Sequence, residues 1–299
     1  MEQAAPPVGV PPVIPVVPRA TSWGSALVVS ALVLALASLW RGDGADLGAL
    51  SRLSVRALAL VMTLQCLSAL AFNEAMLLPL RRSVRELGSC EYYLLRTGGF
   101  VVGAFVPVAG NVGVRLAYLR SRGVSYADFA WATLLSNVHA LASSTVLAVA
   151  ACLVWWRLEG RPDGVVLLLT GGLFVASMTV VALFQRLPQL AGSPRLARVA
   201  WLRTLASATV RDRVQARVFM LSLIRHLLNF ATFGVLYVAL VGTPSAFLAG
   251  GLVYALTTPV RMVNVTPGNV GVHESIVALV GAALSIDLAV SLLAAVVWR

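Results

Sequence analysis

The stretch FAWATLLSNVHALASSTVLAVAACLVWW, residues 129–156, contains no aspartate, glutamate, lysine or arginine. A helix that crosses the hydrocarbon core of a bilayer needs about 20 mainly apolar residues. This stretch is long enough, and similar apolar segments precede and follow it along the chain. The sequence therefore predicts an all-α, polytopic transmembrane helix bundle.

The composition supports a membrane protein over most of the length. The chain has 299 residues, of which 59% are hydrophobic and 12% are charged. A soluble domain has about a quarter charged residues, so this fraction is too small to cover a soluble surface. Cys66, Cys90 and Cys152 form no CxxC motif and no Cys/His cluster, and we expect no disulfide framework, no metal site and no cofactor.

The net charge of +11 comes from arginine alone, because none of the 23 basic residues is lysine. In a soluble protein such a charge would suggest nucleic acid as a partner. Here the arginines lie mostly in short loops between apolar segments. We interpret them as determinants of topology and as contacts with lipid headgroups, and we expect no nucleic-acid partner.

About seven to eight spans are predicted, and one of them, Tyr92–Val106, is interpreted as a half-span. The other segments are Trp23–Trp40, Val55–Leu80, Phe129–Trp156, Gly164–Phe184, Val218–Val241, Phe247–Val263 and Ile276–Trp298. A cleaved signal peptide is the alternative for the first of them, although the long tail before it argues against cleavage. We predict a disordered, proline-rich tail at 1–20 and a single transmembrane domain at 21–299.

Arginine density predicts the orientation. The two arginine-dense loops, 81–85 and 186–217, lie on the same side if Tyr92–Arg122 enters and leaves the membrane from one face. Cytoplasmic loops are enriched in arginine, so we expect both loops and the N-terminus in the cytoplasm of a bacterial cell, with the protein in its inner membrane.

A short motif occurs twice. Residues 107–115 read PVAGNVGVR and residues 267–274 read PGNVGVHE, so GNVGV follows a proline in both. Proline interrupts a helix, and glycine and asparagine tolerate left-handed backbone. Such backbone is tolerated at membrane depth only where it is buried in protein or lines a wet cavity. Paired interruptions indicate the binding site of a transporter; two ordinary interhelical loops are the alternative.

The repeat and the charges inside apolar segments together define a predicted substrate-binding site. Arginine binds phosphate through two parallel hydrogen bonds, and ionisable residues at membrane depth usually face a cavity or a partner. We assign no catalytic residue, and we interpret Glu74 and Asp287 as interfacial and His139 as a buried hydrogen-bonding residue. The predicted substrate-binding residues are Pro107, Gly110, Asn111, Gly113, Arg115, Arg225, Arg261, Pro267, Gly268, Asn269, Gly271, His273 and Glu274.

The same segments resemble the signatures of the lysylphosphatidylglycerol synthase transmembrane-region family, and the resemblance covers most of residues 50–299. The first signature is Leu95-Arg96, then Pro107 to Arg115, then Tyr118-Leu119, and the second is Pro267, Gly268, Gly271 and Glu274. The resemblance implies that the chain moves a phospholipid or an isoprenoid-type lipid between leaflets. In the two-part enzymes of the family a soluble domain transfers the aminoacyl group; this chain lacks that domain, so we expect no synthase activity.

Three hypotheses of function follow. The first is a lipid flippase or lipid-handling transporter, with passive or ion-coupled movement because no ATP site is visible. The second is a membrane-embedded transferase or its membrane subunit, for which His273 with Glu274 is the candidate pair. The third is a membrane anchor for a separate soluble enzyme, and a homo-oligomer is a further possible assembly.

Overall fold

The computed structural model describes residues 51–81, 83–84, 86–105, 112–160, 162–191, 212–262 and 271–298. All the regular secondary structure in these ranges is helical, as predicted. The predicted tail at 1–20 and the predicted span Trp23–Trp40 lie outside the described residues.

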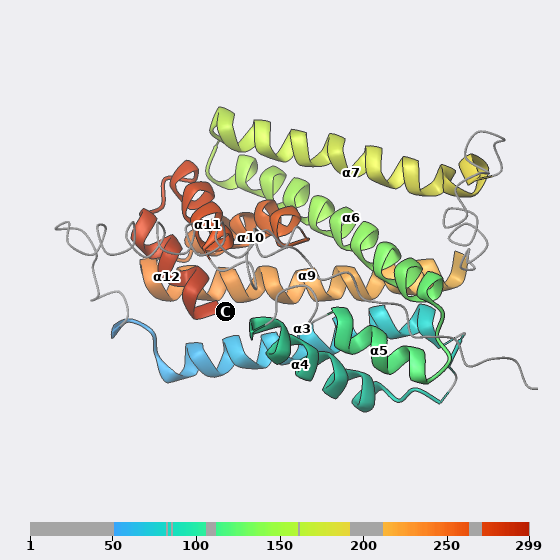
Figure 1. The fold of residues 1–299 in the computed structure, drawn as a ribbon. Helices are drawn as coiled ribbons and strands as arrows, with labels where there is room; N and C mark the ends of the chain where they lie inside the picture. The colour runs from blue at the N-terminus through green and yellow to red at the C-terminus, as the bar shows by residue number, and fades with distance from the viewer. Residues whose placement is uncertain are drawn as a thin grey trace, which may run out of the picture.

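Nine helices are described, with the labels of Figure 1. Their bounds are α3 Val55–Leu80, α4 Ser89–Phe105, α5 Val114–Ser121, α6 Tyr126–Leu158, α7 Gly164–Ala191, α9 Asp212–Val241, α10 Ala246–Met262, α11 Val272–Ala283 and α12 Leu288–Trp298.

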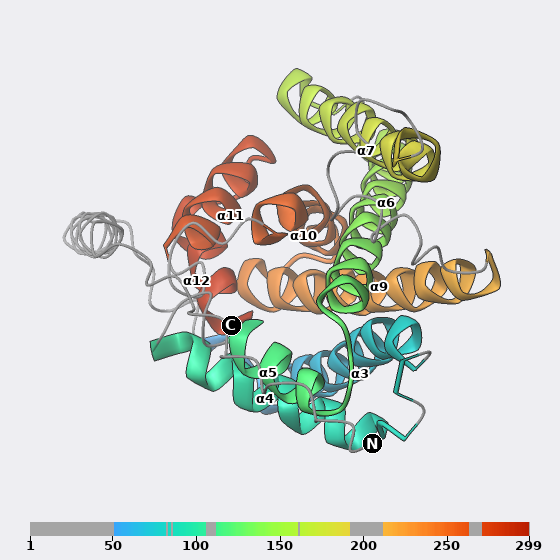
Figure 2. The same ribbon diagram turned by 45° about the vertical axis from the view of Figure 1, so that its right-hand side comes forward.

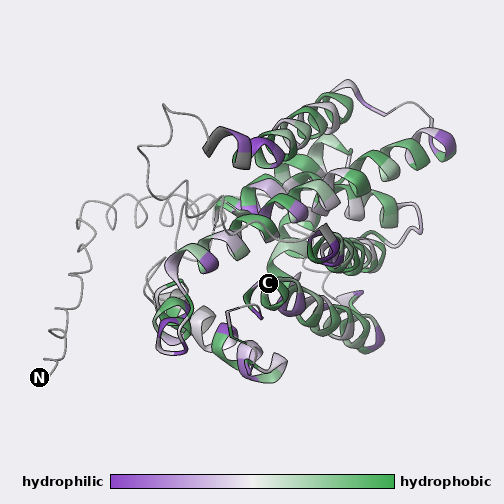
Figure 3. Ribbon diagram, turned by 90° about the vertical axis from the view of Figure 1, so that its right-hand side faces the viewer, coloured by the Kyte–Doolittle hydropathy of each residue, from purple (hydrophilic) through white to green (hydrophobic). Residues whose placement is uncertain are grey.

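Four helices are long and apolar enough to cross a membrane, namely α3, α6, α7 and α9. Their outward side chains are those expected in contact with acyl chains; on α7, for example, Leu168 is 75% exposed and Val175 is 64% exposed. Figure 3 shows apolar residues along the long helices and hydrophilic residues gathered at helix ends and connections. The chain is therefore a multi-pass helical membrane protein.

Helix α9 is the centre of the bundle. It packs against α3, α6, α10 and α12, and both ribbon views show it between α3 on one side and α6 with α10 on the other (Figures 1 and 2). The contact with α10 is close because Gly250 and Gly251 of α10 face the side chains of Phe230 and Tyr237 and the backbone of α9. Helix α7 lies outermost, beside α6.

The described ends of the two arginine-dense segments, 81–85 and 186–217, lie at the same end of the bundle. Leu78 near the end of α3, Phe184 near the end of α7 and Val218 near the start of α9 belong to one buried cluster. Trp131 near the start of α6 joins the cluster by stacking on Phe184, with 4.9 Å between ring centroids. Arg81 and Arg186 therefore lie at one end of the bundle.

The segment Ile276–Trp298, predicted as one span, is two helices instead, α11 and α12. Helix α11 ends where Ser285 adopts a left-handed conformation, with φ of 60°. The carboxylate of Asp287 then accepts hydrogen bonds from the amides of Ala289 and Val290 and caps α12. At 1.5 Å per residue each helix is under about 20 Å long, shorter than the hydrocarbon core of about 30 Å.

Candidate functional site

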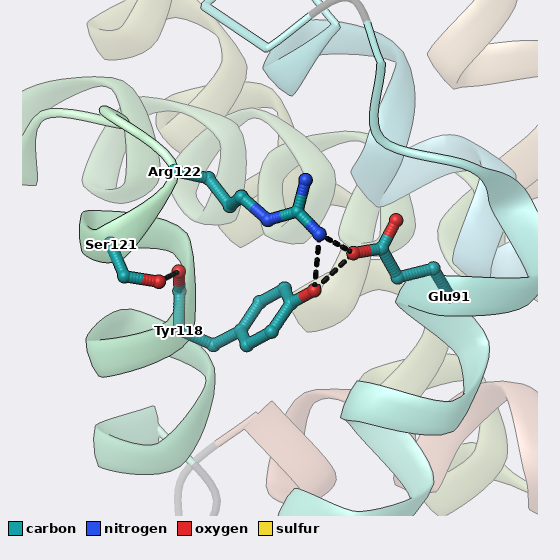
Figure 4. Close-up of polar contacts among 4 residues, drawn as sticks. All are labelled: Glu91, Tyr118, Ser121 and Arg122. Atoms are coloured by element: carbon teal, nitrogen blue, oxygen red, sulfur yellow. Dashed lines mark hydrogen bonds and ion pairs between the residues drawn. The ribbon is translucent and has the colours of Figure 1, made fainter.

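Each GNVGV copy comes between two helices that pack against each other: α4 with α5, and α10 with α11. At the first pair, Glu91 in the first turn of α4 forms an ion pair of 2.7 Å with Arg122 at the end of α5. The Tyr118 hydroxyl also donates to Glu91, and Arg122 donates to the Tyr118 oxygen over 3.0 Å (Figure 4). The outer ends of α4 and α5 therefore meet, and the chain enters and leaves this hairpin at one end.

The hairpin contributes two inward arginines. Arg115, in the first turn of α5, is 8% exposed and lies beside the buried Tyr92 of α4. Arg96, one turn further along α4 than Tyr92, donates a hydrogen bond of 2.8 Å to the side-chain oxygen of Asn73 on α3. The two guanidinium groups are close enough to interact electrostatically.

The Phe72 ring of α3 links the hairpin to the central helix. The guanidinium carbon of Arg96 lies 3.8 Å from the Phe72 ring centroid, and that of Arg225 on α9 lies 3.6 Å from the same centroid. The two cations are therefore no farther apart than these two distances together. Within the described residues, neither guanidinium forms an ion pair with a carboxylate.

Arg261, at the end of α10, extends the series. Its guanidinium carbon lies 4.0 Å from the Trp298 ring centroid and 5.4 Å from that of Tyr254, and it interacts electrostatically with Arg225. Arg115, Arg96, Arg225 and Arg261 thus form one series of neighbouring cations from four helices, α5, α4, α9 and α10, which we call the arginine row.

His273, directly after the second GNVGV copy, is connected to the arginine row through Trp298. The His273 ring lies against the Trp298 ring at 5.4 Å between centroids, and Arg261 contacts the same indole. Gly271, directly before α11, has φ of 90°, a conformation that favours glycine. The carboxylate of Glu274 accepts a hydrogen bond of 2.6 Å from the amide of Gly271, and this bond caps α11.

The predicted site residues thus fall into two groups. Arg225 and Arg261 lie close enough to interact with each other. Arg115 belongs to the same row because it neighbours Arg96, and His273 packs against Trp298, which also contacts Arg261. Gly113, by contrast, precedes α5 outside the arginine row, and Gly271 and Glu274 shape the start of α11. Six of the predicted residues lie outside the described residues: Pro107, Gly110, Asn111, Pro267, Gly268 and Asn269.

The prediction of the site omitted Arg96 and the three rings that hold the cations, Phe72, Tyr254 and Trp298. Arg96 had a usable signal: it is an arginine inside the apolar stretch Tyr92–Val106, and the cost of such a charge was the argument used for Arg225. The aromatic residues had none, because an aromatic residue in an apolar helix is ordinarily part of the core.

The other ionisable residues have local roles. Glu74 forms an ion pair of 3.2 Å with Arg81 near the end of α3, where both side chains are partly exposed. His139 packs edge-on against Phe219. No three His, Cys, Asp or Glu side chains come together as metal ligands in the described part of the chain.

Comparison with known proteins gives one match. The family model described as lysylphosphatidylglycerol synthase TM region matches residues 23–299. No curated protein and no solved structure matches the chain.

Proposed function

The chain belongs to the lysylphosphatidylglycerol synthase transmembrane-region family, and from that premise we propose that it is a lipid flippase or lipid-handling transporter. The family makes it a lipid-related membrane protein. The finer proposal is that an anionic phosphate headgroup, of a phospholipid or an isoprenoid-type lipid, crosses the bilayer through the arginine row. The acyl or prenyl chains would stay in the membrane, against the exposed apolar faces.

The proposal rests on one observation, the position of Arg96 and Arg225. Charges at membrane depth are costly, and they usually face a partner or a cavity. These two guanidiniums share the Phe72 ring and have no carboxylate partner within the described residues. A phosphate supplies the missing negative charge, and its oxygens match the donor geometry of a guanidinium.

The arrangement of the arginine row also suits the movement of a lipid headgroup across the bilayer. Arg115 and Arg96 belong to the α4–α5 hairpin, whereas Arg225 and Arg261 belong to the α9–α10 pair. A headgroup that passes from one pair to the other stays in contact with at least one guanidinium. Successive sites of similar chemistry keep any single site from retaining the ligand, which transport requires.

Proteoliposomes containing short-chain fluorescent lipids test the proposal. We expect movement of phosphatidylglycerol to exceed that of phosphatidylcholine. We expect Arg96→Ala or Arg225→Ala to slow it by roughly tenfold to a hundredfold, because a hydrogen bond to a charged group contributes about 1.5–3 kcal/mol. Arg157→Ala, at the exposed end of α6, is the matched control and should retain the wild-type rate. A lysyl-modified phospholipid in the same assay defines the headgroup preference.

Two results would contradict the proposal. One is the absence of lipid movement by folded, correctly inserted protein. The other is equal loss in Arg157→Ala and Arg225→Ala, because a general effect of removing arginine would then account for the change.

We further propose that the end of the bundle with Arg81 and Arg186 faces the cytoplasm of a bacterial cell, with the N-terminus on the same side. The positive-inside rule supports this orientation. Cys90 is an exposed reporter at that end, because the neighbouring Ser89 accepts a hydrogen bond of 2.9 Å from Arg81. A membrane-impermeant maleimide should label it in inside-out vesicles and not in intact cells, and Cys90→Ser should abolish the label. Labelling in intact cells would reverse the orientation.

A further inference from the structure

A buried imidazole lies in the α9–α10 half of the arginine row. His226 is 1% exposed, and its Nδ1 lies 2.7 Å from the hydroxyl oxygen of Tyr254 on α10. The other ring nitrogen, Nε2, is buried and has no hydrogen-bond partner among the described residues. Leaving a buried polar group unsatisfied costs about 1–3 kcal/mol. A group of this kind beside two arginines is suited to a partner that arrives with the substrate.

The charged groups around His226 are cations. Arg225 is its neighbour on α9, and Arg261 acts on it from α10. Helices α3, α6 and α12 also pack against α9, and no titratable side chain in their described residues acts on the His226 ring. A third positive charge is unfavourable beside two guanidiniums, and an anion bound between them removes that obstacle to protonation of the ring.

We propose that His226 is the proton-binding residue of the site and takes up one proton when an anionic headgroup phosphate binds between Arg225 and Arg261. The inference rests on the proposed function of the arginine row as a phosphate site. The proton is then the ion whose movement is coupled to that of the lipid. A lipid anion and a proton would then bind and leave together.

The proton balance is simple. Water or buffer on the side to which the site is open gives up a proton, and an N–H bond forms on the imidazole. In the resulting cation both nitrogens donate: Nδ1–H to the Tyr254 oxygen, and Nε2–H to a phosphate oxygen. When the lipid leaves, the same N–H bond breaks and the proton returns to water. Coupling of this kind is reciprocal, so a lower pH must also raise the affinity for the phosphate.

Calorimetry of the full chain in detergent micelles tests the coupling directly. The probe is dihexanoyl phosphatidylglycerol, titrated in buffers of different ionisation enthalpy, and the variation of the binding enthalpy gives the protons taken up per lipid. At about pH 7.5 we expect about one proton for the wild type, because a free imidazole is mostly neutral there. His226→Gln retains a hydrogen-bonding side chain that cannot be protonated in this range, and its uptake should be close to zero.

Two further variants complete the experiment. His139→Gln removes an imidazole outside the arginine row, on α6, and should retain the wild-type uptake. Tyr254→Phe retains His226 and removes the oxygen that receives Nδ1–H, so its uptake should fall below that of the wild type. If His226→Gln does not fold, the proton uptake of Tyr254→Phe tests whether His226 binds the proton.

The outcomes separate the two proposals. Lipid binding by the wild type without proton uptake, or with the same uptake in His226→Gln, overturns the inference and leaves the proposed function standing. Unchanged uptake in Tyr254→Phe also counts against it. No binding of the anionic lipid by folded wild-type protein overturns both.

Discussion

Replacing Gly250 by alanine tests how closely α10 must approach α9. A Cβ atom at this position would lie 2.6 Å from the carbonyl oxygen of Phe233 and 2.9 Å from Cβ and Cγ of Tyr237. Contacts under 3.0 Å essentially never occur for real Cβ atoms. Because the nearest atom belongs to the backbone of α9, no rotamer change can relieve the contact, and α10 has to move away by several tenths of an ångström.

The expected change in the free energy of unfolding of Gly250→Ala follows from two opposing effects. Overpacking a well-packed interior costs about 1–3 kcal/mol. Alanine is favoured over glycine within a helix by about 1 kcal/mol. The matched control is Gly172→Ala on α7, where an added Cβ meets nothing within 4 Å. The control obtains the gain in helix propensity without the clash, so the difference between the two variants isolates the packing cost.

Thermal unfolding in detergent micelles measures that difference. We expect Gly250→Ala to melt below Gly172→Ala by roughly 2–4 °C for each kcal/mol of packing cost. The displacement also moves Tyr254, one turn further along α10, away from His226, so lipid movement should slow in Gly250→Ala and not in the control. Equal melting temperatures for the two variants would refute the reasoning, because the α9–α10 contact would then have room for a methyl group.

Three other predictions concern the α4–α5 hairpin, the break before α12 and the Phe72 ring. The Tyr118 hydrogen bond and the charge of Arg122 hold the pKa of Glu91 below its usual 4.5. The stability that Glu91 contributes is therefore present above the unfolded-state pKa and lost as the pH falls through the lowered value, so the melting temperatures of wild type and Glu91→Gln should differ near neutral pH and converge in acid. Ser285→Gly should raise the melting temperature by relieving about 1–2 kcal/mol of left-handed strain, whereas Ser285→Val should lower it; the opposite order would contradict the assigned conformation. Phe72→Leu should slow phosphatidylglycerol movement while Phe72→Tyr retains it, and equal rates for the two variants would exclude the ring as the group that holds the cations.

The sequence predicts the long spans well, because apolar content over about 20 residues is a local property. Residues 129–156 lie within α6, and the segment Val55–Leu80 coincides with α3. The same local rule fails at Ile276–Trp298, where hydropathy does not register backbone conformation. The sequence does contain a signal for the break, since Asp287 precedes an apolar run as an N-cap residue does, but a strongly apolar window outweighs one capping residue.

The candidate site could be predicted in part. Arg225 and Arg261 are recognisable as charges in apolar segments, whatever their surroundings. Their grouping with Arg96 depends on contacts between α3, α4 and α9, which are distant in sequence. The substrate-binding role of all the predicted site residues stays a prediction, and six of them lie in residues 106–111 and 263–270, outside the described ranges.

The role of Phe72 follows from comparing two energies. The guanidinium carbons of Arg96 and Arg225 lie 3.8 and 3.6 Å from one ring centroid. At the largest separation that these two distances allow, about 7.4 Å, two like charges repel by about 2.2 kcal/mol at an effective dielectric constant of about 20. Each cation–π contact contributes about 0.5–2 kcal/mol, so two of them roughly offset the repulsion. The ring therefore holds two cations side by side at little net gain, and an anion that approaches both finds them already positioned. Because assembly of the pair is nearly neutral without the anion, most of the attraction between an arriving phosphate and the two guanidiniums remains available for binding.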